Sequence, residues 1–233
     1  MILFYTSDID NNEALLEEDE FQHCCKVLRH REGDVIHITN GQGIFAQARI
    51  EHIHKRHASL NIIHQTSRER KSIFIELAVA PPKTKSRWEW LLEKTVEVGV
   101  DKISPIITSN IERKKINLDR NRKIIRSAAL QSKRITHPEM SEIISLEKYL
   151  AFPEVQTADK FLCHFDDTNL FLNKAEYSSN HLIVFVGPEG DFNDQELSLL
   201  KQYKCQEVNI SKNRLRTETA AIVAISQVSA LIE

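Results

Sequence analysis

His181 to Leu197 reads HLIVFVGPEGDFNDQEL. Its apolar run, Leu182 to Val186, is long enough for a fully buried strand and too short for a buried helix. Gly187 ends the strand, Pro188 lacks the N–H that strand pairing uses, and Asn193 is a typical helix N-cap. The stretch therefore predicts a strand, a tight loop and a helix.

A second unit of this kind closes the chain. Val208 to Ile210 is a short apolar run, Ser211 to Asn213 is polar, and the motif Leu215-Arg216-Thr217-Glu218-Thr219-Ala220 opens a final helix. In open α/β sheets, ligands bind in the crevice outside the carboxyl ends of the strands. Both loops are therefore candidate binding loops, although Gly-Pro-Glu-Gly taken alone is about as often only a turn.

The same alternation begins near residue 73. Ile73 to Ala80 is strongly apolar, a helix with apolar residues at helical spacing runs up to Gly99, and Ile103 to Thr108 is the next strand. Trp88 lies on the apolar stripe of this helix, whereas Trp90 lies off it. A β-α-β order predicts an α/β fold with a parallel sheet.

The N-terminal part has a different pattern. Residues 13–20, EALLEEDE, predict the start of a short helix that ends near Leu28. Val35 to Thr39 and Ile44 to Ile50 alternate with period two around an Asn-Gly turn, which predicts a β-hairpin. With further strands up to Ile63, this part predicts a small β-barrel or sandwich.

The length of 233 residues allows one large domain or two smaller ones. The polar run SRERKS at residues 67–72 separates the two patterns. We therefore expect an N-terminal domain at residues 1–70 and a larger domain at residues 73–233.

Charge is distributed unevenly, although the net charge is only -2. Basic residues outnumber acidic ones in residues 21–70 and again in residues 112–134, which contain nine basic and two acidic residues. Such surfaces suit a phosphate backbone, and a merely solvated surface is the alternative. The residues that we predict to bind RNA are Lys26, Arg29, Arg31, Arg113, Lys114 and Arg134.

Several classes of protein are disfavoured. The four cysteines form no CxxC pair, and no signal peptide or membrane-length apolar run follows Met1, so we expect reduced thiols and a soluble cytoplasmic protein. His52 and His54 share a strand face, but no ligand spacing repeats, and no metal site is expected. The glycines cannot form a GxGxxG or Walker A loop, and there is no GxSxG elbow.

Gly187-Pro188-Glu189-Gly190 followed by Leu215 to Ala220 resembles the bacterial 16S ribosomal RNA uracil-N3 methyltransferases, members of the SPOUT class. His23, Lys94 and Gln131, each with its neighbours, extend the resemblance over most of the chain. It implies a SPOUT domain with a trefoil knot that binds S-adenosylmethionine, behind an N-terminal PUA-like RNA-binding β-barrel. It also implies a homodimer whose substrate is a uridine in the RNA of the small ribosomal subunit.

The resemblance also implies roles for individual residues. The residues expected to bind the cofactor are Gly187, Glu189, Gly190, Ile210, Ser211 and Leu215. Uracil N3 must lose its proton to attack the methyl carbon, so a cation would favour the anionic base and a carboxylate could accept the proton. We assign Arg216 to the first role and Glu218 to the second. In the first turn of a helix, Glu218 could instead stabilise the helix dipole.

The chain departs from the family pattern at four positions. Asp191, Ser211 and Lys133 stand where the family usually has glycine, and Arg214 stands where it usually has isoleucine. A side chain at a cofactor loop could crowd the ligand, so these departures bear on cofactor affinity. Two alternatives stay open: a SPOUT methyltransferase that modifies another RNA position, and a ribosome-assembly protein with weak or lost catalysis.

Overall fold

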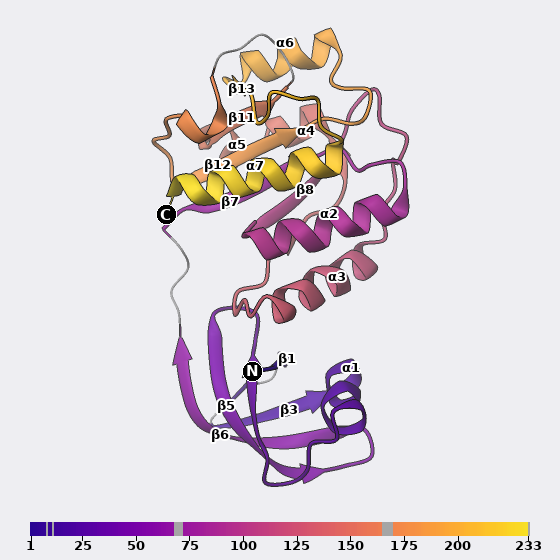
Figure 1. The fold of residues 1–233 in the computed structure, drawn as a ribbon, viewed down its shortest axis with the longest axis vertical. Helices are drawn as coiled ribbons and strands as arrows, with labels where there is room; N and C mark the ends of the chain where they lie inside the picture. Colours follow the sequence, from indigo (N-terminus) through magenta and orange to yellow (C-terminus); the bar gives the residue numbers. More distant parts are fainter. Residues whose placement is uncertain (8, 11, 68–71, 165–169, 233) are drawn as a thin grey trace. The chain divides into compact units, whose positions relative to one another are not determined.

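The structure is a computed structural model that describes residues 1–7, 9–10, 12–67, 72–164 and 170–232. It contains two compact units (Figure 1). The N-terminal unit is Met1–Arg70 with Arg126–His137, and the C-terminal unit is Lys71–Ile125 with Pro138–Glu233. Most of the predicted boundary at residues 67–72 lies outside the described residues.

The N-terminal unit is built on one curled sheet. Its described strands have the order β1-β4-β5-β6-β3-β2. Their bounds are β1 Leu3–Tyr5, β2 Ile9–Asp10, β3 Glu13–Glu17, β4 Val35–Thr39, β5 Ile44–Ile53 and β6 His57–Ser67. The register shifts twice along the β5 and β6 pair, and bulges of this kind bend a sheet. The predicted hairpin is confirmed as β4 and β5, and the sheet forms half of a barrel around its own apolar core.

The helix predicted from residue 13 is wrong at its start. Glu13–Glu17 is strand β3, and the helix α1 covers only Glu18–Phe21 before the π-helix Gln22–Val27. Ala14 and Leu16 are buried while their neighbours are more exposed, which is the period of a strand. β3 pairs with β6, about forty residues further along the chain, so a distant partner overrides the helical preference of the acidic run.

Residues 126–137 join the N-terminal unit through backbone pairing. The N–H of His137 donates to Gly41 O at 2.8 Å, and the N–H of Gly43 donates to Ile135 O at 3.0 Å. A Cβ on Gly41 would lie 2.6 Å from Nδ1 of His137, so only glycine lets this segment approach so closely. The turn that closes the predicted hairpin therefore also holds a segment from within residues 73–233.

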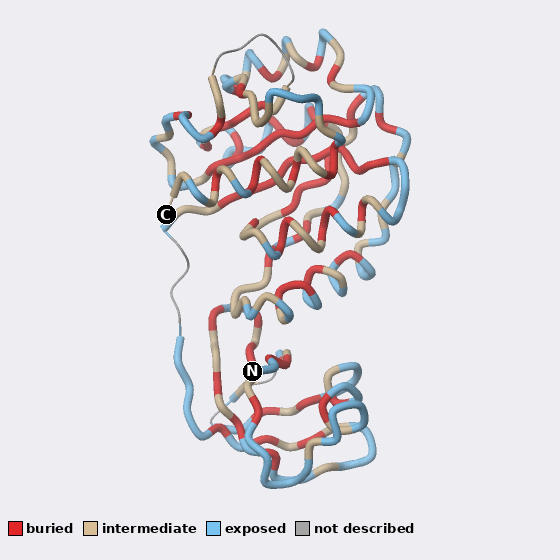
Figure 2. The backbone as a smooth tube through the Cα atoms, in the orientation of Figure 1, coloured by how far each residue is buried: buried red, intermediate tan, exposed pale blue. Residues whose placement is uncertain are grey.

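The C-terminal unit contains a parallel sheet, as predicted. The order of its described strands is β10-β8-β7-β12-β11-β13, with β9 on β8, and all the described pairings in it are parallel. The bounds are β7 Phe74–Val79, β8 Lys102–Ile107, β9 Glu139–Met140, β10 Ile144–Ser145, β11 Asp159–Cys163, β12 His181–Val186 and β13 Gln206–Val208. The central strands are buried on both faces, which explains their continuous apolar runs (Figure 2).

Helices cover both faces of this sheet. The helices are α2 Lys85–Val98, α3 Leu118–Gln131, α4 Leu146–Leu150, α5 Pro153–Thr157, α6 Asp194–Gln202, α7 Thr217–Ile232 and the 3-10 turn η2 Leu172–Lys174. Helix α7 packs on α2, β7 and β12, whereas Ile183 and Phe185 of β12 pack with residues of α4, α5 and α6. The α/β fold is thereby confirmed.

Several local predictions for the helices are confirmed. Trp88 is 2% exposed and Trp90 is 45% exposed, as their places on the helix predicted. Gly99 ends α2 with a φ of 126°, and Asn193 caps α6 in a capping box with Glu196. Within the described ranges, no helix has the length and apolar character needed to cross a membrane.

Candidate functional site

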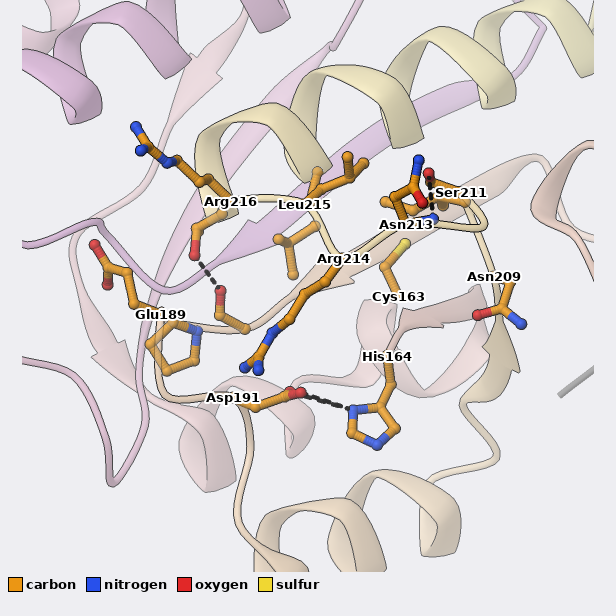
Figure 3. A pocket seen from close by; sticks show the side chains of 16 residues that line it. Cys163, His164, Glu189, Asp191, Asn209, Ser211, Asn213, Arg214, Leu215 and Arg216 are labelled. Carbon is orange, nitrogen blue, oxygen red and sulfur yellow. Dashed lines mark hydrogen bonds and ion pairs between the residues drawn. The ribbon is translucent and has the colours of Figure 1, made fainter. Parts of the chain in front are cut away.

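A cavity lies where three neighbouring parallel strands end. Cys163 of β11 is in register with Val186 of β12 and with Val208 of β13, so the three following loops start at one edge of the sheet. Residues at and just after these strand ends line a cavity of about 340 Å³ (Figure 3). This volume is within the range of small-molecule sites, and the position is the one at which open α/β sheets bind ligands.

The loop after β12 is held in one conformation by its neighbours. The N–H of Asp191 donates to Pro188 O at 3.0 Å and closes a tight turn. Nδ2 of Asn110 donates to Gly190 O at 3.0 Å and to Asp191 O at 2.9 Å. A single side chain from the loop after β8 therefore fixes the carbonyls that end this turn.

Glu189 links the same loop to the segment between β7 and α2. Its Oε1 accepts a hydrogen bond from the N–H of Lys83 at 3.1 Å. Arg113 holds this Pro-Lys turn from the other side, with Nε donating to Pro82 O at 3.0 Å and Nη2 to Lys83 O at 2.8 Å. The guanidinium of Arg113, which we predicted to bind RNA, therefore also braces the wall of the cavity.

Both loop glycines are packed closely against side chains of the protein. A Cβ on Gly187 would lie 3.0 Å from Cε2 of Phe192, and a Cβ on Gly190 would lie 3.2 Å from Cβ of Asn110. Either contact is tighter than usual, so a side chain at these positions requires Phe192 or Asn110 to shift. Packing within the protein therefore already favours glycine at both positions, and Gly187 also lines the cavity.

Two of the departures from the family pattern occupy left-handed backbone. Asp191 has a φ of 60° and Lys133 a φ of 59°. Glycine adopts this region without strain, and aspartate is among the few other residues that tolerate it. The left-handed backbone conformation that glycine favours is thus present at both positions, although each residue carries a side chain.

The first residue of α7 contacts the loop after β12 through a hydrogen bond. Oγ1 of Thr217 donates to Gly187 O at 3.1 Å, which joins the two motifs that the sequence places thirty residues apart. Nε2 of Gln227 donates to Ile210 O at 2.8 Å and ties the loop after β13 to α7. The N–H of Asn213 donates to Oγ of Ser211 at 3.0 Å.

Charged side chains of both signs line the cavity. They come from the loops after β12 and β13 and are Glu189, Asp191, Arg214 and Arg216, and the imidazole of His164 also lines the cavity. Nδ1 of His164 lies 3.2 Å from the Asp191 carboxylate (Figure 3). Burial raises the pKa of the neighbouring Cys163 thiol to about 12, so this thiol is neutral at physiological pH.

Glu218 lies behind the cavity lining. It is 6% exposed, and its Oε1 lies 3.5 Å from Nε of Arg87 on α2. Its Oε2 is buried without a hydrogen-bond partner among the described residues. A buried carboxylate oxygen in this state calls for an explanation, and Arg87 is the cation that faces it.

The cavity brings together most of the residues predicted for cofactor and base. Those that line it are Gly187, Glu189, Ile210, Ser211, Leu215 and Arg216, while Gly190 and Glu218 are not among the lining residues. The residues predicted to bind RNA also lie outside the lining. Lys26, Arg29, Arg31 and Lys114 are exposed, and Arg113 and Arg134 are half-buried.

Sequence reasoning did not select some residues of this site. They are Cys163, His164, Asn209 and Thr217 on the cavity, with Arg87 and Asn110 behind it. His164 follows β11 directly, so the rule that ligands meet strand ends could have found it. Arg87 and Asn110 have no such signal, because their contacts depend on how distant segments pack.

The lining suits the S-adenosylmethionine that the resemblance implies. Val186, Ile210, Leu215 and Ala220 offer apolar surface for a purine ring. Carboxylates and cations in the same cavity can pair with the ammonium, carboxylate and hydroxyl groups of such a molecule. Asp191 is directed to His164 and to the N–H of Phe192 at 2.8 Å, so both its oxygens are already engaged within the protein.

Family comparisons match both parts of the chain. Residues 69–229 match an RNA methyltransferase domain, and residues 16–63 match an RNA methyltransferase PUA domain. The first match alone covers well over half of the chain.

Individual relatives match nearly the whole length. The ribosomal RNA small subunit methyltransferase E of Rickettsia conorii is 30% identical, over 95% of this chain and 91% of the relative. A crystal structure of a probable rRNA-methyltransferase from Porphyromonas gingivalis is 31% identical with a TM-score of 0.88, covering 99% of this chain and 98% of that one. The ribosomal RNA small subunit methyltransferase E from Neisseria gonorrhoeae, bound to S-adenosyl methionine, is 28% identical with a TM-score of 0.89 over the same shares.

Proposed function

The chain belongs to the RNA methyltransferase family, and on this basis we propose that it transfers a methyl group from S-adenosylmethionine to N3 of a uridine in small-subunit ribosomal RNA. The observation that carries the proposal is the meeting of the Gly187 and Leu215 motifs in one cavity, joined by Thr217. The Neisseria relative is bound to this cofactor, and its name specifies the small ribosomal subunit. The choice of uracil N3 rests on the sequence motifs.

The residues of the cavity have distinct tasks in this reaction. S-adenosylmethionine supplies an electrophilic methyl group on its sulfonium. Loops fixed by Asn110 and Glu189 present a preformed site, and positioning of the two reactants accounts for much of the rate in such transfers. Arg216 is exposed on the lining, where its guanidinium can stabilise the uracil anion that must form before attack.

The proton of uracil N3 needs an acceptor, and we keep Glu218 as the candidate. Its buried Oε2 has no partner among the described residues, which favours a role that an arriving group completes. Its low exposure and the nearby Arg87 favour the alternative, in which Glu218 stabilises the start of α7.

RNA binding and assembly complete the proposal. Basic groups on the PUA-like unit and on α3 would hold the ribosomal RNA through its phosphates. We further propose a cytoplasmic homodimer with a trefoil knot in the C-terminal unit, as the resemblance implies. Light scattering of the purified protein would test the dimer, because a monomer at all concentrations contradicts it.

Calorimetric titration with S-adenosylmethionine is the first test of the function. Binding in the micromolar range, followed by a methyl mark on the base of a small-subunit uridine in treated ribosomal RNA, is the expected result. A mark on the ribose would support the alternative SPOUT activity. Absence of binding and of a thermal shift would favour the assembly protein without catalysis.

A conservative substitution separates the two roles of Glu218. Glu218→Gln keeps the size of the side chain but cannot accept the N3 proton as a carboxylate does. If Glu218 is the proton acceptor, the Glu218→Gln variant should lose most of its turnover and keep its affinity for the cofactor. Normal turnover together with a lower melting temperature would assign Glu218 to the helix start instead.

A further inference from the structure

A histidine and an aspartate form a pair on the wall of the cavity. Both oxygens of the Asp191 carboxylate lie 3.2 Å from Nδ1 of His164. His164 directly follows β11, and Asp191 lies in the turn after β12, at a position where the family pattern has glycine. Both side chains line the cavity, yet neither has a task in the proposed reaction.

The pair determines which nitrogen of His164 carries the proton. An ionised carboxylate has only acceptor atoms, so Nδ1 must be the donor in this contact. In a neutral imidazole, Nε2 is then an unprotonated acceptor. Asn110 fixes the backbone of Asp191, and Oδ1 of Asp191 also accepts from its neighbour Phe192, so the carboxylate is held in place to orient the ring.

The surroundings of His164 favour a neutral donor as its partner. The adjacent Cys163 thiol is neutral, and apolar Val186 and Ile210 line the same cavity. Figure 3 shows Glu189 and Arg216 at the opposite side of the view from His164, with Arg214 between them. A neutral imidazole nitrogen suits the amino group of adenine or the hydroxyls of ribose, whereas Glu189 and Arg216 suit the reacting end.

We propose that His164, oriented by Asp191, accepts a hydrogen bond from the adenosyl part of the cofactor. The inference rests on the proposed use of S-adenosylmethionine and adds a specificity determinant to that site. Asp191 is then a positioning residue, and a departure from the family pattern serves cofactor recognition.

Imidazole nitrogen NMR tests the tautomer without any ligand. Because Nδ1 of His164 faces the Asp191 carboxylate, the neutral ring should carry its proton at Nδ1 and not at Nε2. Asp191→Gly removes the partner, and glycine tolerates the left-handed backbone at this position, so the variant should fold and show a mixture of tautomers. A wild-type ring protonated at Nε2 would overturn the proposal.

Titration with three ligands tests the contact itself. His164→Phe keeps a ring of similar size but removes the acceptor. It should lower the affinity for S-adenosylmethionine, S-adenosylhomocysteine and adenosine by the same factor, about two- to tenfold. Asp191→Gly should lower the affinity for all three ligands by a smaller factor. His64→Phe, on an exposed residue of β6, is the matched control and should change none of them.

Different failures have different signatures. Unchanged adenosine affinity with weaker S-adenosylmethionine would place His164 at the methionine end and overturn the inference. Unchanged affinity for all three ligands with lost methyl transfer would assign His164 to the RNA base, and would also overturn it. A wild-type protein that binds none of the three contradicts the proposed function itself, whereas normal wild-type binding with unaltered variants contradicts this inference alone.

Discussion

The two ends of strand β12 have opposite surroundings. At its amino end, His181 donates through Nε2 to the fully buried Glu76 of β7 at 2.9 Å. The hydroxyl of Tyr149 also donates to Glu76, at 2.7 Å, and Nζ of Lys102 lies 3.2 Å from it. At the carboxyl end, Gly187 opens a cavity lined by polar side chains. One strand thus connects a closed polar cluster with an open one.

This difference separates stability from function. A buried carboxylate surrounded by donors has satisfied its hydrogen-bonding capacity, and losing it leaves buried partners unpaired. Groups such as Arg216 at the other end are exposed and keep capacity for a ligand. We therefore expect substitutions at the Glu76 cluster to change the free energy of unfolding, and substitutions at the cavity to change binding or turnover.

Glu76→Ala should have the largest effect. It removes the acceptor that pairs with Lys102 and His181, and breaking a buried ion pair in this way costs about 3 to 5 kcal/mol. Urea denaturation would measure the loss in the free energy of unfolding. Glu76→Gln keeps the size and is the milder control. A variant of unchanged stability but lower cofactor affinity would reverse the assignment of the two ends.

Arg216→Ala should test the opposite end. Removing a group that stabilises charge in the transition state lowers turnover about 10²-fold. Because Arg216 is exposed, we expect the free energy of unfolding to stay within about 0.5 kcal/mol of the wild-type value. Single-turnover methylation of ribosomal RNA gives the rate, and Arg216→Lys keeps the charge as a control. A raised KM for RNA with an unchanged rate would make Arg216 a phosphate contact instead.

Gly187→Val should affect both properties, because Gly187 connects the strand to the cavity. Its Cβ would lie 3.0 Å from the ring of Phe192, which is itself buried. Overpacking of this kind costs about 1 to 3 kcal/mol. A lower melting temperature and weaker cofactor binding are expected, and adding Phe192→Leu should restore part of the stability. No recovery in the double variant would mean that something other than Phe192 requires glycine here.

Low pH should reduce the contribution of the Glu76 cluster to the free energy of unfolding. Burial raises the pKa of Glu76, but the hydrogen bond from His181 and the charge of Lys102 outweigh it, so the pKa lies below its ordinary value of 4.5. A lowered folded pKa stabilises the protein above the unfolded pKa, and this contribution is lost as the pH falls through the folded pKa. The stability difference between wild type and Glu76→Gln should therefore shrink below about pH 4.5. A difference that grows with acid would contradict the direction of this shift.

The sequence predicted the elements whose signals are local. The run at Leu182 to Val186, the cap at Asn193 and the stop at Gly99 each depend on neighbours within a few residues, and the structure has all three. The segment Glu13–Glu17 was misassigned because its strand character comes from pairing with β6. Local preference cannot report a partner so far along the chain.

The residues of the candidate site also fall into those with a local sequence signal and those without one. The motifs at Gly187 and Leu215 were visible because their composition is specific, and the cavity unites them. His164 was overlooked although it directly follows β11 and the strand-end rule could have selected it; that this strand end lies beside the other two motifs follows from the order β12-β11-β13. Arg87 was overlooked because the burial of Glu218 results from the packing of α7 against α2.

Asn110→Ala should have the smallest effect and the most selective one. Its side chain is exposed but donates two hydrogen bonds to the carbonyls of Gly190 and Asp191, so its loss should cost about 1 kcal/mol. The larger consequence falls on the loop, because the turn that carries Asp191 loses the group that fixes it. Hydrogen exchange should rise at the N–H of Asp191 while the amides of β12 stay protected. Equal loosening along β12 would mean that its two ends are not independent, and the contrast between them would fail.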